Sequence, residues 1–320
     1  MVIIMNNYQL PSASLLKSYQ PDYAFLPNAN FVSMHSVISS VEFMDEQTMT
    51  LPVALGRSLD GTVQLLDLAK ASHLLIAGTD IARLDLSFAI NSIITSLLFK
   101  RTPSEVQFVK WGSYRLNVYY KMLRPYFISD ISKCYNKNQF ANDVIPQSAT
   151  NALAWLNWEF ERRMNLLEHS HCHNLNEYNS LIINPRDHIP YLVVLAEDII
   201  SDINFWKSQA QKMVLPVIRK LLNNAQLAGI HFVFYEQMCE RSNKILYELL
   251  NLLPIRLAFY IPEKGVCAKI TGTNEPAQLN FDSGEMIYYN NGTLNRLIAP
   301  YMERSELVAV SNHVKEHIRL

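Results

Sequence analysis

One stretch of this 320-residue sequence has the layout of a phosphate-binding loop. An apolar run beginning at His73 ends at Gly78-Thr79 and passes within a few residues into a helical pattern that continues to Phe99. A strand, a tight turn and a helix N-terminus in this order can hold phosphate groups on backbone N–H groups. This stretch is therefore the first candidate for chemistry.

The residues that would complete such a loop are replaced. The pattern G-x-x-x-x-G-K-[ST] needs a glycine, a lysine and a serine or threonine at positions 83, 84 and 85, where this chain has Arg83, Leu84 and Asp85. Leu84 cannot neutralise phosphate charge, and a carboxylate at Asp85 repels it. A carboxylate at Asp85 would instead stabilise the start of the helix through the helix dipole, by about 0.3–1 kcal/mol.

Arg83 offers one alternative, because a guanidinium can bind phosphate through two hydrogen bonds. However, its side chain stands where a glycine would let the backbone approach the phosphates, and residues 80–85 contain no glycine. We predict that this loop has ordinary strand-to-helix geometry and does not bind phosphate.

A second candidate is the pair Glu197-Asp198, which follows the apolar run Tyr191 to Ala196. Acids at the carboxyl end of a buried parallel strand can serve a ligand. They are also tolerated there simply as exposed residues, and this is the interpretation we favour.

Two further segments have compositions that could bind a ligand. His169 to His173 contains three histidines and Cys172, but zinc sites usually use two separated ligand pairs and no second pair is visible, so no metal site is predicted. The residues between Tyr114 and Lys137 are rich in tyrosine and lysine. They could contact nucleic acid, although a solvated irregular loop has the same composition and is favoured.

Composition predicts a well-buried globular protein. Hydrophobic residues make up 49% and charged residues 18% of the chain, and the net charge of −1 gives no overall attraction to nucleic acid or anionic membranes. Four widely spaced cysteines fit a reducing compartment, and no apolar stretch is long enough to span a membrane. A cytoplasmic protein without membrane attachment is expected.

The hydrophobic pattern predicts an α/β fold with a mainly parallel sheet flanked by helices. Asp60-Gly61 predicts a hairpin between residues 51–57 and 62–68, residues 114–142 read as irregular, and Pro216 should break or kink a helix. Strands are predicted at residues 74–78, 105–110, 191–196, 230–235, 255–260, 285–289 and 294–299. Helices are predicted at residues 33–43, 84–99, 148–167, 205–228, 242–252 and 305–318, with Ser148 as the N-cap of the third.

Many short segments resemble, in order, one family: the FtsK/SpoIIIE DNA translocases. The resemblance covers residues 51–317. The matching segments include Leu51 to Gly56, His73 to Thr79, Glu159 to Arg163, Pro190 to Leu195, Ala228 to His231, Leu253 to Phe259 and Gly284 to Tyr288.

The resemblance implies a RecA-like P-loop NTPase fold at residues 51–320, preceded by a proline-punctuated extension at residues 1–50. Members of the family form hexameric rings around DNA, so homologous ring subunits or another protein partner are expected. It also implies that Glu197 and Asp198 stand at the Walker B positions, where the acids bind Mg²⁺ and activate water, with their order reversed. Gln237 would match a polar residue near the γ-phosphate, and Arg162-Arg163 could be remnants of a subunit or DNA contact or surface charges.

Three functions remain open from the sequence. The first, which we favour, is a pseudo-ATPase without bound cofactor that acts as a structural or regulatory subunit. The second is a divergent ATP-dependent DNA translocase, acting in chromosome segregation, cell division or DNA transfer, with ATP and Mg²⁺ held by Arg83 and Glu197. The third is a passive DNA-binding module, which the near-neutral charge disfavours.

Overall fold

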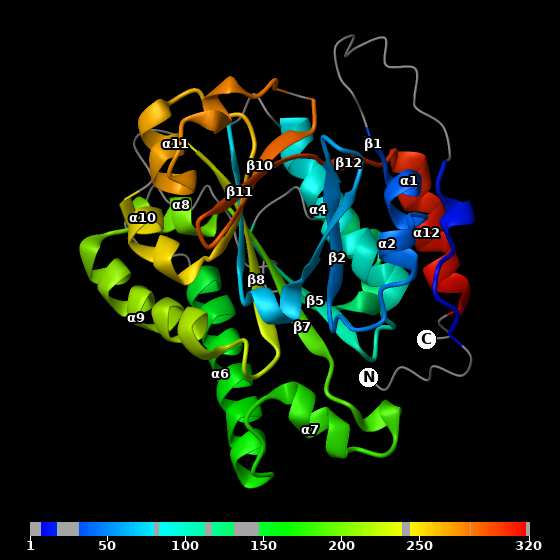
Figure 1. The fold of residues 1–320 in the computed structure, drawn as a ribbon. Helices are drawn as coiled ribbons and strands as arrows, with labels where there is room; N and C mark the ends of the chain where they lie inside the picture. Colours follow the sequence, from blue (N-terminus) through cyan, green and yellow to red (C-terminus); the bar gives the residue numbers. More distant parts are fainter. Residues whose placement is uncertain are drawn as a thin grey trace.

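The computed structural model describes residues 8–17, 32–79, 83–112, 117–130, 147–238, 244–281 and 283–317. Within this part of the chain, ten strands form one sheet in the order β3-β2-β11-β10-β9-β4-β8-β7-β5-β6 (Figure 1). The strands from β9 to β6 in this order are parallel, and those from β3 to β9 pair antiparallel. The sheet is thus mixed, with a parallel half that contains β4, β8 and β7 at its centre.

The strands of this sheet have the following bounds: β2 Pro52–Ser58, β3 Val63–Asp67, β4 Leu74–Gly78, β5 Val106–Gly112, β6 Phe127–Asp130, β7 Tyr191–Glu197, β8 Ile230–Gln237, β9 Ile255–Ala258, β10 Glu285–Asn290 and β11 Thr293–Ile298. Two short strands, β1 Val32–Ser33 and β12 Pro300–Tyr301, pair separately and in parallel. The central strands are apolar along most of their length because both faces of the sheet are covered.

Helices cover both faces, as Figure 1 shows. One face packs against α1 Met34–Ile38, α2 Val41–Met44, α4 Arg83–Lys100 and α12 Arg304–His317. The other packs against α6 Gln147–His169, α8 Ile199–Asn204, α9 Ser208–Asn224, α10 Lys244–Leu249 and α11 Lys264–Thr271. The remaining α-helices are α3 Leu68–Ala71, α5 Asn117–Met122 and α7 Leu175–Leu181. Within the described residues, no helix is long and apolar enough to cross a membrane.

Helix α4 fits its position between the sheet and the short N-terminal helices. It carries no charged side chain from Ser87 to Phe99, and it packs on β2, β4, β12 and α1. A helix surrounded in this way is apolar on most of its circumference. It begins at Arg83, shortly after β4 ends at Gly78, in the strand-to-helix order that the sequence predicted.

Several sequence predictions are confirmed, including the hairpin of β2 and β3 and the central strands β4, β7 and β8. Others were wrong. The expected helix at residues 33–43 is two short helices, because Ser40 interrupts it and accepts a hydrogen bond from Phe43 N (3.2 Å). Helix α9 continues through Pro216, and the break lies instead before it, between Asn204 and Ser208.

Two more predictions about elements were wrong. The supposedly irregular residues 114–142 contain α5 and β6 in their described part. Helices α7, α8 and α11 were not predicted, because each is shorter than nine residues and carries too few turns for its periodicity to show. The long helix α6 begins at Gln147, so Ser148 lies inside the helix and is not its N-cap as predicted.

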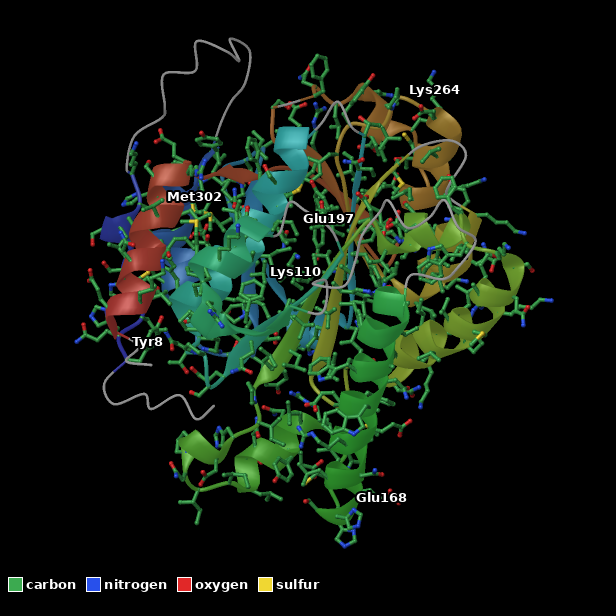
Figure 2. The ribbon with its side chains drawn as sticks, turned by 180° about the vertical axis from the view of Figure 1, so that it is seen from behind. Tyr8, Lys110, Glu168, Glu197, Lys264 and Met302 are labelled. Carbon is green, nitrogen blue, oxygen red and sulfur yellow. The ribbon has the colours of Figure 1, made fainter. Side chains whose placement is uncertain are left out.

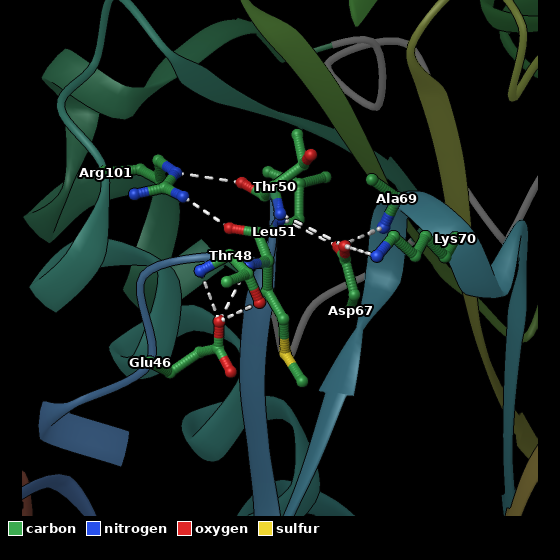
Figure 3. A network of polar contacts seen from close by, with 9 residues as sticks. Glu46, Thr48, Thr50, Leu51, Asp67, Ala69, Lys70 and Arg101 are labelled. Atoms are coloured by element: carbon green, nitrogen blue, oxygen red, sulfur yellow. Dashed lines mark hydrogen bonds and ion pairs between the residues drawn. The ribbon is translucent and has the colours of Figure 1, made fainter. Parts of the chain in front are cut away.

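Asp67 ties the N-terminal hairpin to the start of the parallel sheet (Figure 3). Its carboxylate accepts hydrogen bonds from Thr50 N (3.1 Å), Leu51 N (2.9 Å) and Ala69 N (3.1 Å), and it is the N-cap of α3. Arg101 binds the residues just before β2 from the other side, by donating hydrogen bonds to the carbonyls of Thr50 and Met49. These contacts fix the segment that leads from residue 50 into β4.

Candidate functional site

The frame of the candidate phosphate loop is present in the backbone. Strand β4 is buried throughout and ends at Gly78, and α4 begins at Arg83. Both neighbouring strands fix the end of β4: Met238 N donates to Gly78 O (2.7 Å) and Phe259 N donates to Ala77 O (2.9 Å). Thr79 is buried, with its hydroxyl 3.5 Å from Tyr260 O. The strand end is therefore held rigidly in the sheet.

The central residues of the loop lie outside the described part of the chain. Residues 80–82 are not described, and neither are the side chains of Arg83, Leu84 and Asp85. The prediction that the loop does not bind phosphate therefore stays a prediction. What the structure gives is the spacing, with four residues between Gly78 and the first residue of α4.

The strand order brings the other predicted site residues to the same edge. Strand β8 lies between β4 and β7, so that Gly78 is in register with Gln237, and Tyr235 with Glu197. Carboxyl ends of parallel strands meet at one edge of a sheet, which is where α/β proteins bind ligands. Gln237 thus lies beside the end of β4, and Glu197 and Asp198 lie one strand further along the same edge, although residues 78 and 237 are far apart in the sequence.

The acidic pair is buried, which corrects the expectation of exposed acids. Glu197 is 1% exposed and Asp198 is 8% exposed. Asp198 has left-handed backbone angles (φ 53°, ψ 22°), its N–H donates to Tyr235 O (2.9 Å), and its carboxylate accepts from Gln237 N (3.0 Å). The tight turn after β7 thus folds Asp198 back onto β8, where hydrogen bonding offsets the cost of burial.

Gly112 allows β5 to approach the backbone of Glu197 closely. Gly112 is in register with Glu197 and has a φ of +118°, and a Cβ atom on it would lie 2.4 Å from Glu197 O. No other residue fits this place without moving one of the strands. The position of Glu197 therefore depends on a glycine of the neighbouring strand.

Glu236 is a buried acid of this site that the sequence reasoning missed. It is 0% exposed, and its carboxylate accepts hydrogen bonds from Ile200 N (2.9 Å), Ser201 N (3.0 Å) and the Ser201 hydroxyl (2.7 Å). Burial, reinforced by the nearby charge of Asp198, raises the pKa of Glu236 to about 8. The sequence signal that could have found Glu236 is the alternation of side chains along β8, which places Glu236 on the face of the sheet opposite to Gln237.

Gln237 is the third predicted site residue at this edge, at the end of β8. Its Nε2 is buried and finds no hydrogen-bond acceptor within the described residues. A buried amide N–H without an acceptor destabilises the folded state unless a hydrogen-bond acceptor binds to it. In the sheet, Gln237 stands between the end of β4 and the acidic pair.

Arg162 and Arg163 have a structural role in α6. Arg163 is 2% exposed and donates to Glu159 (2.7 Å) and to Ala228 O (3.0 Å), while Arg162 binds Glu159 with two hydrogen bonds of 2.8 Å. Interpreting both arginines as surface charges is therefore wrong for Arg163. Arg163 thus connects α6 to the turn before β8, and Arg162 binds Glu159 within the helix.

The other two binding candidates are the histidine tract and the tyrosine-rich segment. The histidine tract follows the end of α6, and the described residues contain no group of three or more His, Cys, Asp or Glu arranged to hold a metal. In the tyrosine-rich segment, Tyr119 and Tyr126 are buried and bind Asn91 and Arg101 O, respectively, so they do not belong to a solvated loop. Tyr114 and Lys137 lie outside the described residues.

Comparison with known proteins gives a consistent family match. The model of the FtsK/SpoIIIE family matches residues 37–240. The chain is 31% identical over 287 residues to the DNA translocase FtsK of Chlorobaculum tepidum, covering 88% of this chain and 34% of that protein. It is 29% identical over 295 residues to the DNA translocase FtsK of Staphylococcus aureus, covering 88% and 35%. The chain thus spans about a third of the length of these relatives.

Solved structures confirm the fold. The cytoplasmic domain of the type VII secretion ATPase EccC of Thermomonospora curvata superimposes with a TM-score of 0.68 at 14% identity, covering 89% of this chain and 34% of that chain. The pCW3 conjugation coupling protein TcpA gives a TM-score of 0.62 at 15% identity, covering 87% and 72%. At these identities the likeness concerns the fold alone. It confirms the RecA-like P-loop fold expected from the sequence.

Proposed function

The chain belongs to the FtsK/SpoIIIE family, and from this premise we propose that it is a motor-core protein that does not hydrolyse ATP and that acts as a structural or regulatory subunit. Its partner would be a homologous ring subunit or another protein. The chain shares its fold with its relatives, but the chemistry of that fold depends on a few residues of the site.

The replacement of three P-loop residues carries this proposal. A working loop uses a glycine for close backbone approach, a lysine on the β- and γ-phosphates and a hydroxyl on Mg²⁺. Arg83, Leu84 and Asp85 supply none of these groups in the usual geometry. Asp85 adds a negative charge next to the place where the phosphates would lie, which opposes binding.

The acids of the site support the same conclusion. Asp198 accepts from Gln237 N and Glu236 accepts from three donors at the start of α8, so both carboxylates already take part in hydrogen bonds that hold the fold together. Compared with the family's Walker B pair, Glu197 has one methylene more and Asp198 one fewer. A displacement of about 1 Å can reduce a catalytic rate about 100-fold.

Nucleotide binding tests the proposal directly. We expect MgATP at millimolar concentration to leave the melting temperature of the wild-type chain unchanged, because a ligand stabilises a protein only as it binds the folded state. The matched control is the triple variant Arg83→Gly, Leu84→Lys, Asp85→Thr, which restores the loop pattern and should gain a shift that rises with ATP concentration. A concentration-dependent shift in the wild type would contradict the proposal.

The alternative is a divergent ATP-dependent DNA translocase, and two observations favour it. The relatives with the highest identity quoted above are named DNA translocases, and acids stand at both Walker B positions. In this case Arg83 would bind the phosphates and Glu197 would hold Mg²⁺. It predicts ATP hydrolysis that DNA stimulates and that Glu197→Gln or Asp198→Asn abolishes.

A further inference from the structure

A polar cavity lies at the edge of the sheet opposite the candidate site. Its volume is about 400 Å³, within the range of pockets that bind ligands. Tyr191 begins β7, Glu105 directly precedes β5 and Arg101 directly follows α4, and all three line the cavity. The rest of the lining comes from residues 47–50, before β2, and from α7 and His188. The cavity thus joins segments that are far apart in the sequence.

The cavity is remote from the acidic pair. Because β5 and β7 run parallel, their first residues lie at one edge of the sheet, and Glu197, the last residue of β7, lies at the other. In Figure 2, Glu197 is well separated from Glu168, which lies near the end of α6 where the chain leads into α7. An occupant of the cavity therefore leaves the phosphate-loop edge untouched.

Hydrogen bonds hold the first wall of the cavity, residues 47–50, in place (Figure 3). The carboxylate of Glu46 accepts from Thr48 N (2.5 Å) and Met49 N (2.8 Å). From the other side, Arg101 donates to the carbonyls of Met49 (2.6 Å) and Thr50 (2.8 Å). This wall is therefore fixed without a ligand.

The second wall, formed by α7 and His188, is held in the same way. The side chain of Asn179 donates to Ile189 O (2.9 Å) and accepts from Ile189 N (3.0 Å), so α7 is tied to the residues that enter β7. One ring nitrogen of His188, Nε2, lies 3.1 Å from Ile182 O. A cavity with two fixed walls is formed in advance, which reduces the cost of ordering on binding.

The lining suits a ligand that both donates and accepts hydrogen bonds. Thr50, Asn176 and Tyr191 contribute two hydroxyl groups and an amide, and each of these groups can donate and accept. Burial raises the pKa of Tyr191 to about 12, so that its hydroxyl keeps its proton at neutral pH. A peptide backbone presents N–H and C=O groups in alternation and matches such a lining.

The charges of the lining argue against nucleic acid. Arg101 and Glu105 carry opposite charges and are the lining residues with a permanent charge. The guanidinium of Arg101 also donates to three backbone carbonyls, those of Met49, Thr50 and Lys100. Phosphate backbones are bound by several lysines and arginines together. An uncharged ligand fits this balance better.

Exposed apolar side chains lie next to the cavity. The chain between the lining residues Ser180 and His188 carries Leu181, which is 63% exposed, and Ile183, which is 99% exposed. On the side of the first wall, Met44 is 53% exposed, and its carbonyl accepts from the side chain of Gln47 (3.5 Å). Apolar groups beside hydrogen-bonding groups are typical of surfaces that bind proteins.

We propose that this cavity is a docking site for an uncharged, extended segment of a partner protein. The backbone amides of the segment bind the polar lining, and its apolar side chains cover Leu181 and Ile183. The inference rests on the proposed function, because it gives a subunit that does not hydrolyse ATP the contact through which it acts. Its tests contain no nucleotide, so they can fail while the ATP measurements succeed, and the reverse.

Selection of peptides tests the docking site. A phage-displayed library of random heptapeptides is selected on the immobilised wild-type chain, and synthetic copies of the enriched peptides are titrated by fluorescence anisotropy. We expect saturable binding of uncharged peptides with apolar residues. Asn176→Arg, which fills the cavity, and Ile183→Asp should each weaken binding by about tenfold or more. If Asn176→Arg does not fold, Ser180→Arg on the same helix replaces it.

Matched controls keep the assignment specific. Asn312→Arg, on the exposed side of α12, and Met213→Asp, at a residue of α9 that is 62% exposed, make the same changes away from the cavity. Both should leave the peptide affinity unchanged. No saturable peptide binding, or binding that Asn176→Arg and Ile183→Asp leave unchanged, would overturn the proposal. Equal losses in the control variants would overturn it as well.

Two other occupants are separate outcomes. Double-stranded DNA that displaces the bound peptides would place nucleic acid in the cavity. A dimer of the wild-type chain in analytical ultracentrifugation, dissociated by both Asn176→Arg and Ile183→Asp, would make the occupant a second copy of this chain. Either result would overturn the proposal, whereas a monomer whose peptide binding DNA does not affect supports it.

Discussion

Gly112 sets the distance between β5 and the strand that carries Glu197. We expect Gly112→Ala to destabilise the protein by at least about 2 kcal/mol, because it adds a strained positive φ to a clash that one of the strands must relieve. Urea denaturation measures the change. Gly61→Ala is a matched control, since Gly61 also has a positive φ (+91°) but no atom within 4 Å of the added Cβ. Equal losses for the two variants would show that the close approach to Glu197 has no energetic weight.

Glu236 gives the stability of the fold a pH dependence at the residue level. Its folded-state pKa of about 8 lies above the ordinary value of 4.5, so between these values the folded state binds more protons than the unfolded state. Its contribution is therefore complete below pH 4.5 and is lost as pH rises toward 8. Asp202, whose pKa burial raises to about 7, acts in the same direction.

Removing the ionisable group tests this dependence. The slope from one such group is at most about 1.4 kcal/mol per pH unit, and Glu236→Gln should remove it. Chemical denaturation of both proteins at pH 5, 6, 7 and 8 is expected to show the variant's cost shrinking as pH rises. A difference that stays constant over this range would mean that Glu236 does not change its protonation on folding.

At the scale of elements, the side chain of Asp67 connects the residues before β2 to the start of α3. We expect Asp67→Ala to destabilise the protein by about 2–4 kcal/mol, because it removes a helix cap and leaves the buried N–H of Leu51 without its partner. Asp67→Asn keeps an oxygen for Leu51 N and Ala69 N and should recover part of the loss. Thermal denaturation of both variants checks this order, and equal losses would point to the charge and not to the hydrogen bonds.

Two buried histidines sit at the amino-terminal ends of β4 and β8, opposite the candidate site. His73 binds Leu222 O (3.1 Å) and accepts from Phe232 N (3.1 Å), and His231 binds Ser72 O (2.9 Å). Burial lowers the pKa of His73 to about 3 and that of His231 to about 4. Both are therefore neutral in the folded state at ordinary pH.

These histidines predict loss of stability in acid. Below pH 6.5 the unfolded chain binds protons that the folded chain does not, so their contribution, complete above pH 6.5, falls as pH decreases toward 4. His231→Asn should reduce the slope of the free energy of unfolding against pH in this range by up to about 1.4 kcal/mol per pH unit. Unfolding curves at pH 4.5, 5.5 and 6.5 measure the effect, and identical slopes in variant and wild type would contradict it.

At the scale of the whole molecule, the sequence predicted those parts of the fold that local patterns encode. Strands such as Tyr191–Glu197 are apolar runs of the right length, and the turn at Asp60-Gly61 determines its hairpin locally. The order of matching segments implied roles for Gly78, Glu197, Asp198 and Gln237, but their meeting at one edge follows from the strand order of the structure. The family comparison then confirmed the fold.

The remaining features depend on contacts between distant parts of the chain. The burial of Asp198 results from its hydrogen bond with β8, and Glu236 is buried by the start of α8, a helix too short to predict. Likewise, β4 and β5 follow each other in sequence but β8 and β7 lie between them in the sheet. No local pattern contains this information, because pairing is decided by the packing of the complete sheet.

Steady-state ATP hydrolysis in the presence of double-stranded DNA tests the central claim most directly. The wild-type chain, the Glu197→Gln variant and the triple variant with the restored loop are assayed side by side with Mg²⁺. The proposed function predicts that phosphate release by the wild type equals that of Glu197→Gln. DNA-stimulated hydrolysis by the wild type that Glu197→Gln abolishes would contradict it and establish a divergent ATPase.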